Sequence, residues 1–189
     1  HLLHKEEIAA SCVKDGTKTA GHPNPGGFPA AWYINGVESP ALTLERGATY
    51  TFQMNNSSPF HPFFLTASNL GGPSAARWTD GVSPLTDVSG TQILTFTVPV
   101  TAPDTLYYQC HAHERMGWKL LIVNPPCIAD YNGDKEADIL DFLDFFDDFG
   151  QCDQLPAPCG SLGNPDVNGD TVIDVLDFLD FLDAFGTGC

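Results

Sequence analysis

The chain has 189 residues, 42% of them hydrophobic, which is enough for one or two domains with a buried core. It holds 24 acidic and 8 basic side chains, and the net charge of −16 argues against binding to nucleic acid or to an anionic membrane surface. No apolar run approaches the length of about 18 residues that a membrane-spanning helix needs, so we expect no membrane span.

The acidic residues are concentrated in the last third of the chain. Residues 1–126 hold 9 acidic and 7 basic side chains (net −2), whereas residues 127–189 hold 15 and 1 (net −14). The composition therefore changes at the pair Pro125-Pro126. We predict an N-terminal extension over residues 1–29, a first domain over 30–124 and a second domain over 127–189.

Six cysteines, four of them in the acidic third, indicate an oxidising compartment. The sequence begins with His1 rather than Met, which favours a mature secreted chain from which a signal peptide has been removed. We therefore expect a secreted, extracellular or cell-surface protein. A chain that was shortened at its start is the alternative.

Short alternating or β-branched runs recur in the first domain, and turn residues such as Asn35-Gly36 and Pro103-Asp104 separate them. The runs cover residues 31–37, 49–54, 92–98, 105–109 and 119–123. No helical period competes with them, so the pattern predicts a β-sandwich.

The residues with metal chemistry follow the fourth of these runs. Cys110, His113 and Met116 stand at intervals of three, and a tight loop would direct them to one centre. Thiolate, imidazole and thioether are soft ligands that select copper, and a second histidine would complete an electron-transfer site. His61 is the best candidate, because the aromatic residues around it would keep the metal dry.

With these four residues, residues 30–124 resemble a cupredoxin of the plastocyanin or amicyanin kind. Residues 33–40 and 42–47 are similar to the opening strands of bacterial cupredoxins. The resemblance implies an all-β Greek-key sandwich with His61, Cys110, His113 and Met116 as ligands of one type 1 copper. Four protein ligands leave no position for a substrate. We therefore expect a one-electron carrier with an unknown redox partner, or a copper store or sensor, and not an enzyme.

Two alternatives remain open at this site. Cys110 could instead form a structural disulfide with Cys12, which would pair all six cysteines. His111 could be a fifth donor, a substitute for His113 or an exposed residue. We expect it to be exposed, because neighbours along a strand point to opposite faces.

The second domain is an internal repeat, in which residues 130–150 and 166–186 share 14 of 21 residues at an offset of 36. Oxygen-bearing side chains at loop positions 1, 3, 5, 9 and 12 are typical of an EF-hand calcium loop, in which position 7 contributes a main-chain carbonyl. The expected ligands of the first calcium ion are Asp130, Asn132, Asp134, Glu136, Asp138 and Asp141, and those of the second are Asp166, Asn168, Asp170, Val172, Asp174 and Asp177. Position 6, which is usually Gly, is Lys135 and Thr171.

A helix is expected after each loop, over residues 139–149 and 175–185, with Gly150 and Gly186 at the C-caps. In the first helix, Ile139, Phe142, Leu143 and Phe146 form one apolar face, with aspartates opposite. No helix is evident before either loop.

One loop and one following helix, duplicated over residues 127–189, resemble a type I dockerin. The resemblance implies a small all-α domain of two loop-helix units that holds two calcium ions and docks onto a cohesin-like protein or a neighbouring subunit. The expected partner-binding residues are Ile139, Leu140, Val175 and Leu176, with Phe145 and Phe181 added from the helices. A calcium-stabilised module without a partner is the alternative.

The cysteines of this domain bracket the repeats, so we expect the disulfides Cys127–Cys152 and Cys159–Cys189. A Cys127–Cys189 clasp with Cys152–Cys159, or a crossed set, is also possible from the sequence.

Together these patterns predict a secreted type 1 copper protein for electron transfer, tethered through a calcium-dependent module. The competing hypothesis is an extracellular structural or assembly protein, which could form a homo-oligomer and in which copper is incidental or absent.

Overall fold

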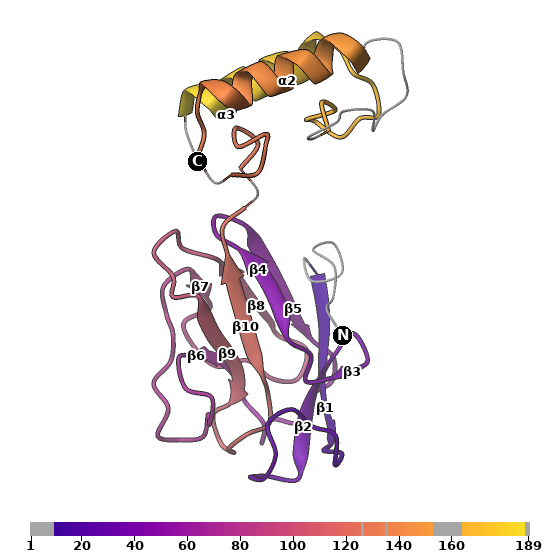
Figure 1. Cartoon of the computed structure of the whole chain (residues 1–189). Helices are drawn as coiled ribbons and strands as arrows, with labels where there is room; N and C mark the ends of the chain where they lie inside the picture. Colours follow the sequence, from indigo (N-terminus) through magenta and orange to yellow (C-terminus); the bar gives the residue numbers. More distant parts are fainter. Residues whose placement is uncertain (1–9, 126, 135, 153–163, 188–189) are drawn as a thin grey trace. The chain divides into compact units, whose positions relative to one another are not determined.

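The structure is a computed structural model of the chain, and it describes residues 10–125, 127–134, 136–152 and 164–187 (Figure 1). The chain divides into two compact units, His1–Pro125 and Pro126–Cys189. The division falls at the proline pair where the composition of the sequence changes.

The first unit is a β-sandwich of two mixed sheets (Figure 1). In the described residues one sheet has the strand order β3-β2-β1-β5-β8-β7 and the other the order β4-β10-β9-β6. The strands are β1 (Ala10–Thr17), β2 (Ala30–Ile34), β3 (Val37–Glu38), β4 (Leu42–Glu45), β5 (Thr49–Met54), β6 (Phe63–Thr66), β7 (Val82–Ser83), β8 (Ile93–Thr97), β9 (Thr105–Cys110) and β10 (Lys119–Val123). The predicted β-sandwich is confirmed.

Strand β1 lies within residues 1–29, so the prediction that these residues form an extension outside the sandwich is wrong. It pairs antiparallel with β2 and parallel with β5, so it is a central strand of its sheet. Its alternation is hard to see in the sequence because Ser11, a small polar residue, occupies one of the inward positions beside Val13. Both residues are fully buried.

The core between the two sheets is rich in aromatic side chains. The rings of Trp32 and Phe63 meet edge to face at 5.2 Å, and the buried Tyr108 hydroxyl donates a hydrogen bond to the carbonyl of Pro40. Cys110 and Met116 belong to the same buried cluster. The core therefore continues to the end of the sandwich where the predicted metal ligands lie.

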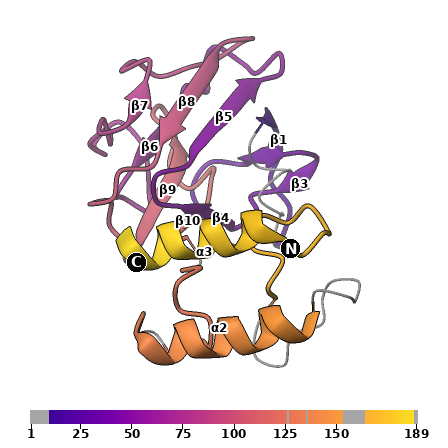
Figure 2. The same cartoon turned by 90° about the horizontal axis from the view of Figure 1, so that it is seen from above.

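In the second unit, α2 (Ile139–Cys152) and α3 (Val175–Thr187) lie side by side (Figure 2). The rings of Phe145 and Phe181 are both fully buried and stack at a centroid distance of 4.0 Å. Tyr131 completes the buried cluster. Both helices continue through Gly150 and Gly186, so the predicted C-caps are wrong.

The predicted faces of the first helix are also wrong. The buried face of α2 consists of Asp141, Phe145, Asp148 and Cys152, spaced by three or four residues. Leu143 and Phe146, which we expected in the apolar core face, are 54% and 57% exposed. The aspartates turn inward because Asp141 closes the preceding loop, and this orientation buries Phe145 instead of offering it to a partner.

No helix in the described ranges combines the length and the apolar character needed to cross a membrane.

Candidate metal centres

Three short segments bring the four predicted copper ligands to one end of the sandwich. Cys110 is the last residue of β9, and His113 and Met116 lie in the loop from β9 to β10. Cys110 pairs with Phe63, the first residue of β6, so the segment just before β6 brings His61 to the same end of the sandwich.

The thiol of Cys110 and one imidazole nitrogen of His113 are suitably placed to bind the same ion. Sγ of Cys110 lies 3.7 Å from Nδ1 of His113. First-row metals bind sulfur and imidazole nitrogen at about 2.3 and 2.0 Å, so one ion can reach both atoms. The rings of His61 and His113 stand edge to face at 5.0 Å, and Met116 is fully buried. The donor set and its burial fit a copper ion.

His61 stands slightly apart from the other ligands. The possible ligand atoms of His61, Cys110 and His113 do not all lie within 4.8 Å of one another, whereas in the described part of the chain those of Asp130, Asp134 and Asp141 do. Nδ1 of His61 instead faces Oδ2 of Asp15 at 3.1 Å.

Phe28 covers both histidines, and it was not among the predicted site residues. Its ring stacks on that of His113 at 3.7 Å and meets that of His61 edge to face at 5.4 Å. Gly27 makes this approach possible: its φ is +69°, and a Cβ there would lie 2.6 Å from the carbonyl oxygen of Glu114. Phe28 was not predicted as a site residue because it lies in residues 1–29, which were expected to form an extension.

Burial shifts the pKa values of two predicted ligands, Cys110 and His113. It raises the pKa of the Cys110 thiol to about 11, so a metal has to displace a proton from the sulfur. Burial, with a smaller contribution from the His61 ring, lowers the pKa of His113. The imidazole of His113 is therefore neutral at pH 7, as metal binding requires.

The loop that holds Met116 is fixed by hydrogen bonds. The carbonyl of Met116 accepts from the backbone N–H of Trp32 at 2.7 Å and from the hydroxyl of Ser39 at 3.1 Å. Gly117 donates its N–H to Oε1 of Gln109, and a Cβ at position 117 would lie 1.9 Å from the carbonyl oxygen of Tyr108. The ligand loop is therefore held before any metal binds.

His111 points away from the candidate site, as alternation along the strand predicts, but it is not simply exposed. Its Nδ1 lies 2.6 Å from Oδ2 of Asp87, and Arg77 holds the same carboxylate with two hydrogen bonds. Burial works against ionisation of Asp87, but the hydrogen bonds from Arg77 and His111 outweigh it and lower the pKa of Asp87. His111 is a half-buried partner of this ion pair.

The disulfide that the sequence allowed between Cys12 and Cys110 is not formed. Both residues are free thiols, Cys12 half-buried on β1 and Cys110 buried at the candidate site. Cys110 is thus available as a ligand.

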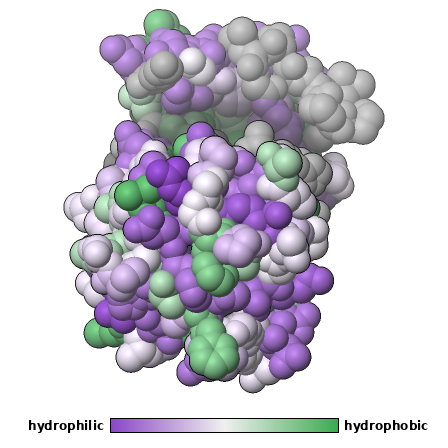
Figure 3. Space-filling view, turned by 90° about the horizontal axis from the view of Figure 1, so that it is seen from below, coloured by the Kyte–Doolittle hydropathy of each residue, from purple (hydrophilic) through white to green (hydrophobic). Residues whose placement is uncertain are grey.

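The surface at this end of the sandwich shows no single apolar area. Figure 3 shows small apolar areas separated by hydrophilic side chains on the face seen from below. Phe60, next to His61 in sequence, is 77% exposed.

In the second unit, the first loop gathers carboxylates around one point. One oxygen from each of Asp130, Asp134 and Asp141 lies within 4.8 Å of the others. Asp141 is fully buried and accepts the N–H groups of Asn132 at 3.0 Å and Asp138 at 2.8 Å. The carboxylate at loop position 12 thus closes the loop onto the start of α2.

The second loop repeats this arrangement. Asp177 is fully buried and accepts N–H groups from Val167 and Asp174, at 2.8 and 2.9 Å. Oδ2 of Asp166 accepts from Thr171, whereas its buried Oδ1 has no hydrogen-bond partner among the residues described. A buried carboxylate oxygen left in this way is suited to bind a cation.

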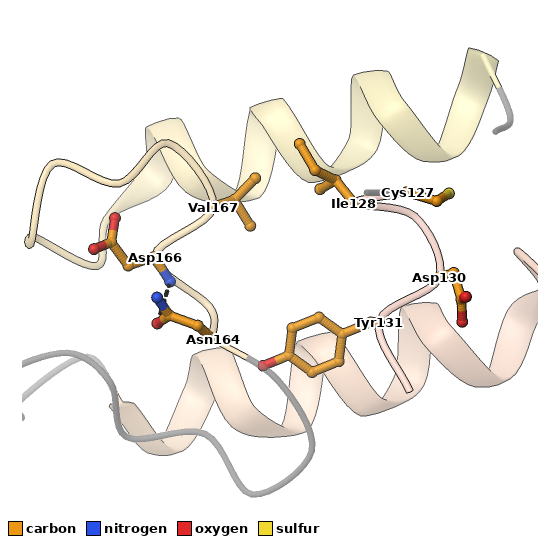
Figure 4. A pocket seen from close by; sticks show the side chains of 7 residues that line it. All are labelled: Cys127, Ile128, Asp130, Tyr131, Asn164, Asp166 and Val167. Carbon is orange, nitrogen blue, oxygen red and sulfur yellow. Dashed lines mark hydrogen bonds between the residues drawn. The ribbon is translucent and has the colours of Figure 1, made fainter. Parts of the chain in front are cut away.

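A pocket of about 230 Å³ separates the two loops (Figure 4). It is lined by Cys127, Ile128, Asp130, Tyr131, Asn164, Asp166 and Val167. Figure 4 shows the carboxylates of Asp130 and Asp166 on opposite sides of it. The two loops are therefore separate candidate sites and do not share one ion.

Cys127 and Cys152 are each disulfide-bonded. Cys159 and Cys189 lie outside the described residues, as does Lys135 of the first loop. The expected pairing of the four cysteines stays a prediction.

The chain has curated relatives in a plant and an insect. It is 29% identical over 123 residues to the "Cytochrome b561, DM13 and DOMON domain-containing protein At5g54830" of Arabidopsis thaliana, with 62% of this chain and 14% of that protein covered. It is 25% identical over 166 residues to "Protein Skeletor, isoforms B/C" of Drosophila melanogaster, with 59% and 21% covered. The chain thus spans about a fifth or less of the length of these relatives.

Solved structures of copper proteins show a weaker likeness. Rusticyanin from Thiobacillus ferrooxidans is 22% identical to this chain. The alignment covers 61% of this chain and 78% of the rusticyanin chain, with a TM-score of 0.35. McoA multicopper oxidase from Aquifex aeolicus is 15% identical. The alignment covers 66% of this chain and 28% of the oxidase chain, with a TM-score of 0.34. At these TM-scores, the fold assignment rests on the strand pairings of the chain itself and not on this likeness.

A family model described as "At5g54830-like domain" matches residues 6–124. The match includes β1 and ends just after β10, so it covers the whole sandwich and more than half of the chain. The chain belongs to the At5g54830-like domain family.

Proposed function

We propose that the first unit is a type 1 copper protein that transfers one electron at a time, with His61, Cys110, His113 and Met116 as copper ligands. The observation that carries this proposal is the buried Cys110 thiol, 3.7 Å from the imidazole of His113 and in the same buried cluster as Met116. A soft donor set of this kind at the end of a β-sandwich is typical of electron-transfer copper sites.

The residues around the ligands would support this chemistry. A bound copper ion would supply a centre that alternates between Cu(I) and Cu(II). The hydrogen bonds to the carbonyl of Met116 hold the ligand loop in one conformation, and the Phe28 ring shields both histidines from water. Four protein ligands leave no position for a substrate, so we propose a carrier and not an enzyme.

Replacement of Met116 by Leu should keep the colour of the oxidised protein and raise its reduction potential. The thioether supplies electron density that stabilises Cu(II), whereas the intense absorption comes from the Cys110 thiolate. A tenfold loss of preference for Cu(II) over Cu(I) would raise the potential by about 59 mV. Spectroelectrochemical titration measures both properties. Met54→Leu is the matched control, since Met54 is equally buried but lies on β5. An unchanged potential in Met116→Leu would exclude Met116 as a ligand.

For the second unit, we propose that each of the two loops forms a calcium site. We also propose that the protein is secreted and works outside the cell. The carboxylate cluster of the first loop and the unsatisfied Oδ1 of Asp166 in the second support the sites. The net charge of −14 over residues 127–189 also favours bound cations, because they would offset the repulsion between carboxylates in a compact fold. The disulfide bonds of Cys127 and Cys152 favour an oxidising compartment.

Thr171→Gly should strengthen calcium binding at the second loop. Thr171 occupies loop position 6 with a φ of +73°, a conformation that is unfavourable for a β-branched residue. Relief of about 1 kcal/mol corresponds to roughly a fivefold lower Kd. Calorimetric titration of the whole chain with calcium measures the change. Val172→Gly, one residue further on, gains nothing of this kind and serves as the control. Equal or weaker binding by Thr171→Gly would contradict the prediction.

A second candidate function, calcium-dependent docking or assembly, is favoured by the apolar side chains that α2 and α3 leave exposed. Ile139, Leu140, Val175 and Leu176 are 52–61% exposed, as partner-binding residues must be. The occupant would be a cohesin-like protein or a neighbouring subunit. In the assembly hypothesis, copper would be incidental.

Leu140→Asp should weaken such docking modestly, and Leu140→Asp with Leu176→Asp should abolish it, because the repeat offers two nearly equivalent faces. Binding to immobilised cohesin modules and size-exclusion chromatography, each with and without calcium, test the two occupants. Lys119→Asp in the sandwich controls for the added charge. A parent chain that is monomeric and binds no cohesin, or a double variant that binds like the parent, would leave the calcium module as a stabiliser only.

A further inference from the structure

The loop from β1 to β2, residues 18–29, covers part of the candidate copper centre. Phe28, near the end of this loop, contacts the rings of both His61 and His113. These two histidines are partly exposed, whereas the other two predicted ligands are fully buried, so the histidines form the solvent side of the centre. An ion that enters or leaves on this side has to pass the Phe28 ring.

One lysine side chain fastens this loop to the loop that carries the ligands. Residues 18–29 contain neither helix nor strand, so their backbone carbonyls need other partners. The Lys18 ammonium donates hydrogen bonds to the carbonyl of Gly26 at 2.7 Å, to that of Asn24 at 3.4 Å and to that of Arg115. An ammonium has three N–H donors and no acceptor, so these three carbonyls use all its donors. Arg115 belongs to the β9–β10 loop, and Lys18 therefore joins the two loops.

The β1–β2 loop also has hydrogen bonds that do not involve the Lys18 side chain. The backbone N–H of Phe28 donates to the carbonyl of Glu114 at 3.1 Å, and the side-chain amide of Asn24 donates to the carbonyl of Asn69 at 2.7 Å. Loss of the ammonium should therefore loosen the loop without unfolding the sandwich.

We propose that Lys18 is a positioning residue that holds the Phe28 ring over the two histidines and thereby slows the exchange of copper with solvent. This inference rests on the copper function proposed above. Of the carbonyls that Lys18 binds, that of Gly26 is two residues before Phe28. The carbonyl of Arg115 is two residues after His113. The ammonium thus fixes the covering ring to the ring that it covers.

Lys18→Met tests this role, because Met keeps an unbranched apolar side chain but has no N–H donor. Hydrogen bonds from a charged donor are stronger than neutral ones, so we expect the variant to lose Cu(I) to bathocuproine disulfonate about tenfold faster than the parent chain. In the metal-free variant, the amide hydrogen of Phe28 should also exchange about tenfold faster. The amide of Val98, which donates to the carbonyl of Ala48, should exchange as in the parent.

A double-mutant cycle shows whether Lys18 acts through Phe28. Phe28→Leu should by itself accelerate the loss of copper, because the smaller side chain covers less of the histidines. Addition of Lys18→Met to this variant should then change the rate by roughly twofold at most. Lys14→Met is the matched control, since Lys14 is exposed on β1 and carries the same charge. It should leave copper loss and amide exchange as in the parent.

The outcomes distinguish this inference from the copper function itself. A parent chain that takes up no copper overturns both. A copper-binding parent whose Lys18→Met variant releases copper at the rate of Lys14→Met overturns the role of Lys18 alone. Unchanged exchange of the Phe28 amide does the same, as does exchange that rises equally at Phe28 and Val98. Effects of Lys18→Met and Phe28→Leu that multiply in full would show that Lys18 does not act through the ring.

Discussion

Replacement of Cys110 by Ser is expected to abolish the intense visible absorption of the oxidised, copper-loaded protein. The absorption of such sites arises from charge transfer between a thiolate and Cu(II), and a hydroxyl cannot replace the thiolate. Serine is similar in volume, so the sandwich should still fold. Burial of the hydroxyl beside Phe63 should cost about 1–3 kcal/mol in the free energy of unfolding. Absorption spectra, copper content and thermal unfolding of the metal-free protein measure the three effects.

The chain contains its own control for this experiment. Cys12 is the other free thiol of the sandwich, half-buried on β1. Cys12→Ser should retain full colour and copper content. The copper site would be wrong if the copper-loaded parent were colourless or if Cys12→Ser lost the colour as well.

The sequence predicted which residues come together at the candidate copper site better than it predicted their surroundings. Cys110, His113 and Met116 are close in sequence, so their spacing alone indicates a common site, and the pairing of β9 with β6 brings His61 to it. Asp15 is placed near the site by β1, which is inserted between β2 and β5. Phe28 precedes β2, and its backbone N–H donates to the carbonyl of Glu114. Both arrangements are long-range and leave no local pattern in the sequence, which is why neither residue was predicted.

In the second unit, the repeat predicted the loops and the starts of α2 and α3 but not the helix faces. Apolar spacing favoured a face that includes Leu143, whereas the structure buries the face that includes Asp141. Spacing rules assign charged residues to solvent. Here backbone N–H groups of the loop donate hydrogen bonds to the Asp141 carboxylate, and these hydrogen bonds turn the Asp141 face of the helix inward.

The same buried carboxylates lead to the expectation that chelation of calcium unfolds the second unit and leaves the sandwich folded. Asp141 and Asp177 are fully buried, and without cations each loop holds several uncompensated negative charges. The buried hydrophobic core of the described part is small, with Tyr131, Phe145 and Phe181 at its centre. Calcium at 100 times its Kd stabilises by about 2.7 kcal/mol per site, so two sites contribute about 5 kcal/mol, comparable with the whole stability of a small domain.

Limited proteolysis and hydrogen exchange of the whole chain with and without EDTA measure this effect. In EDTA, cleavage and exchange should rise steeply in residues 127–189, while residues 10–125 stay protected. The double variant Asp141→Ala with Asp177→Ala should show the same pattern in the presence of calcium. Asp180→Asn removes an exposed negative charge from α3 outside the expected ligand set, and it should behave like the parent. If EDTA leaves protection of residues 127–189 unchanged, the loops do not depend on calcium, and Asp141 and Asp177 act only as caps for α2 and α3.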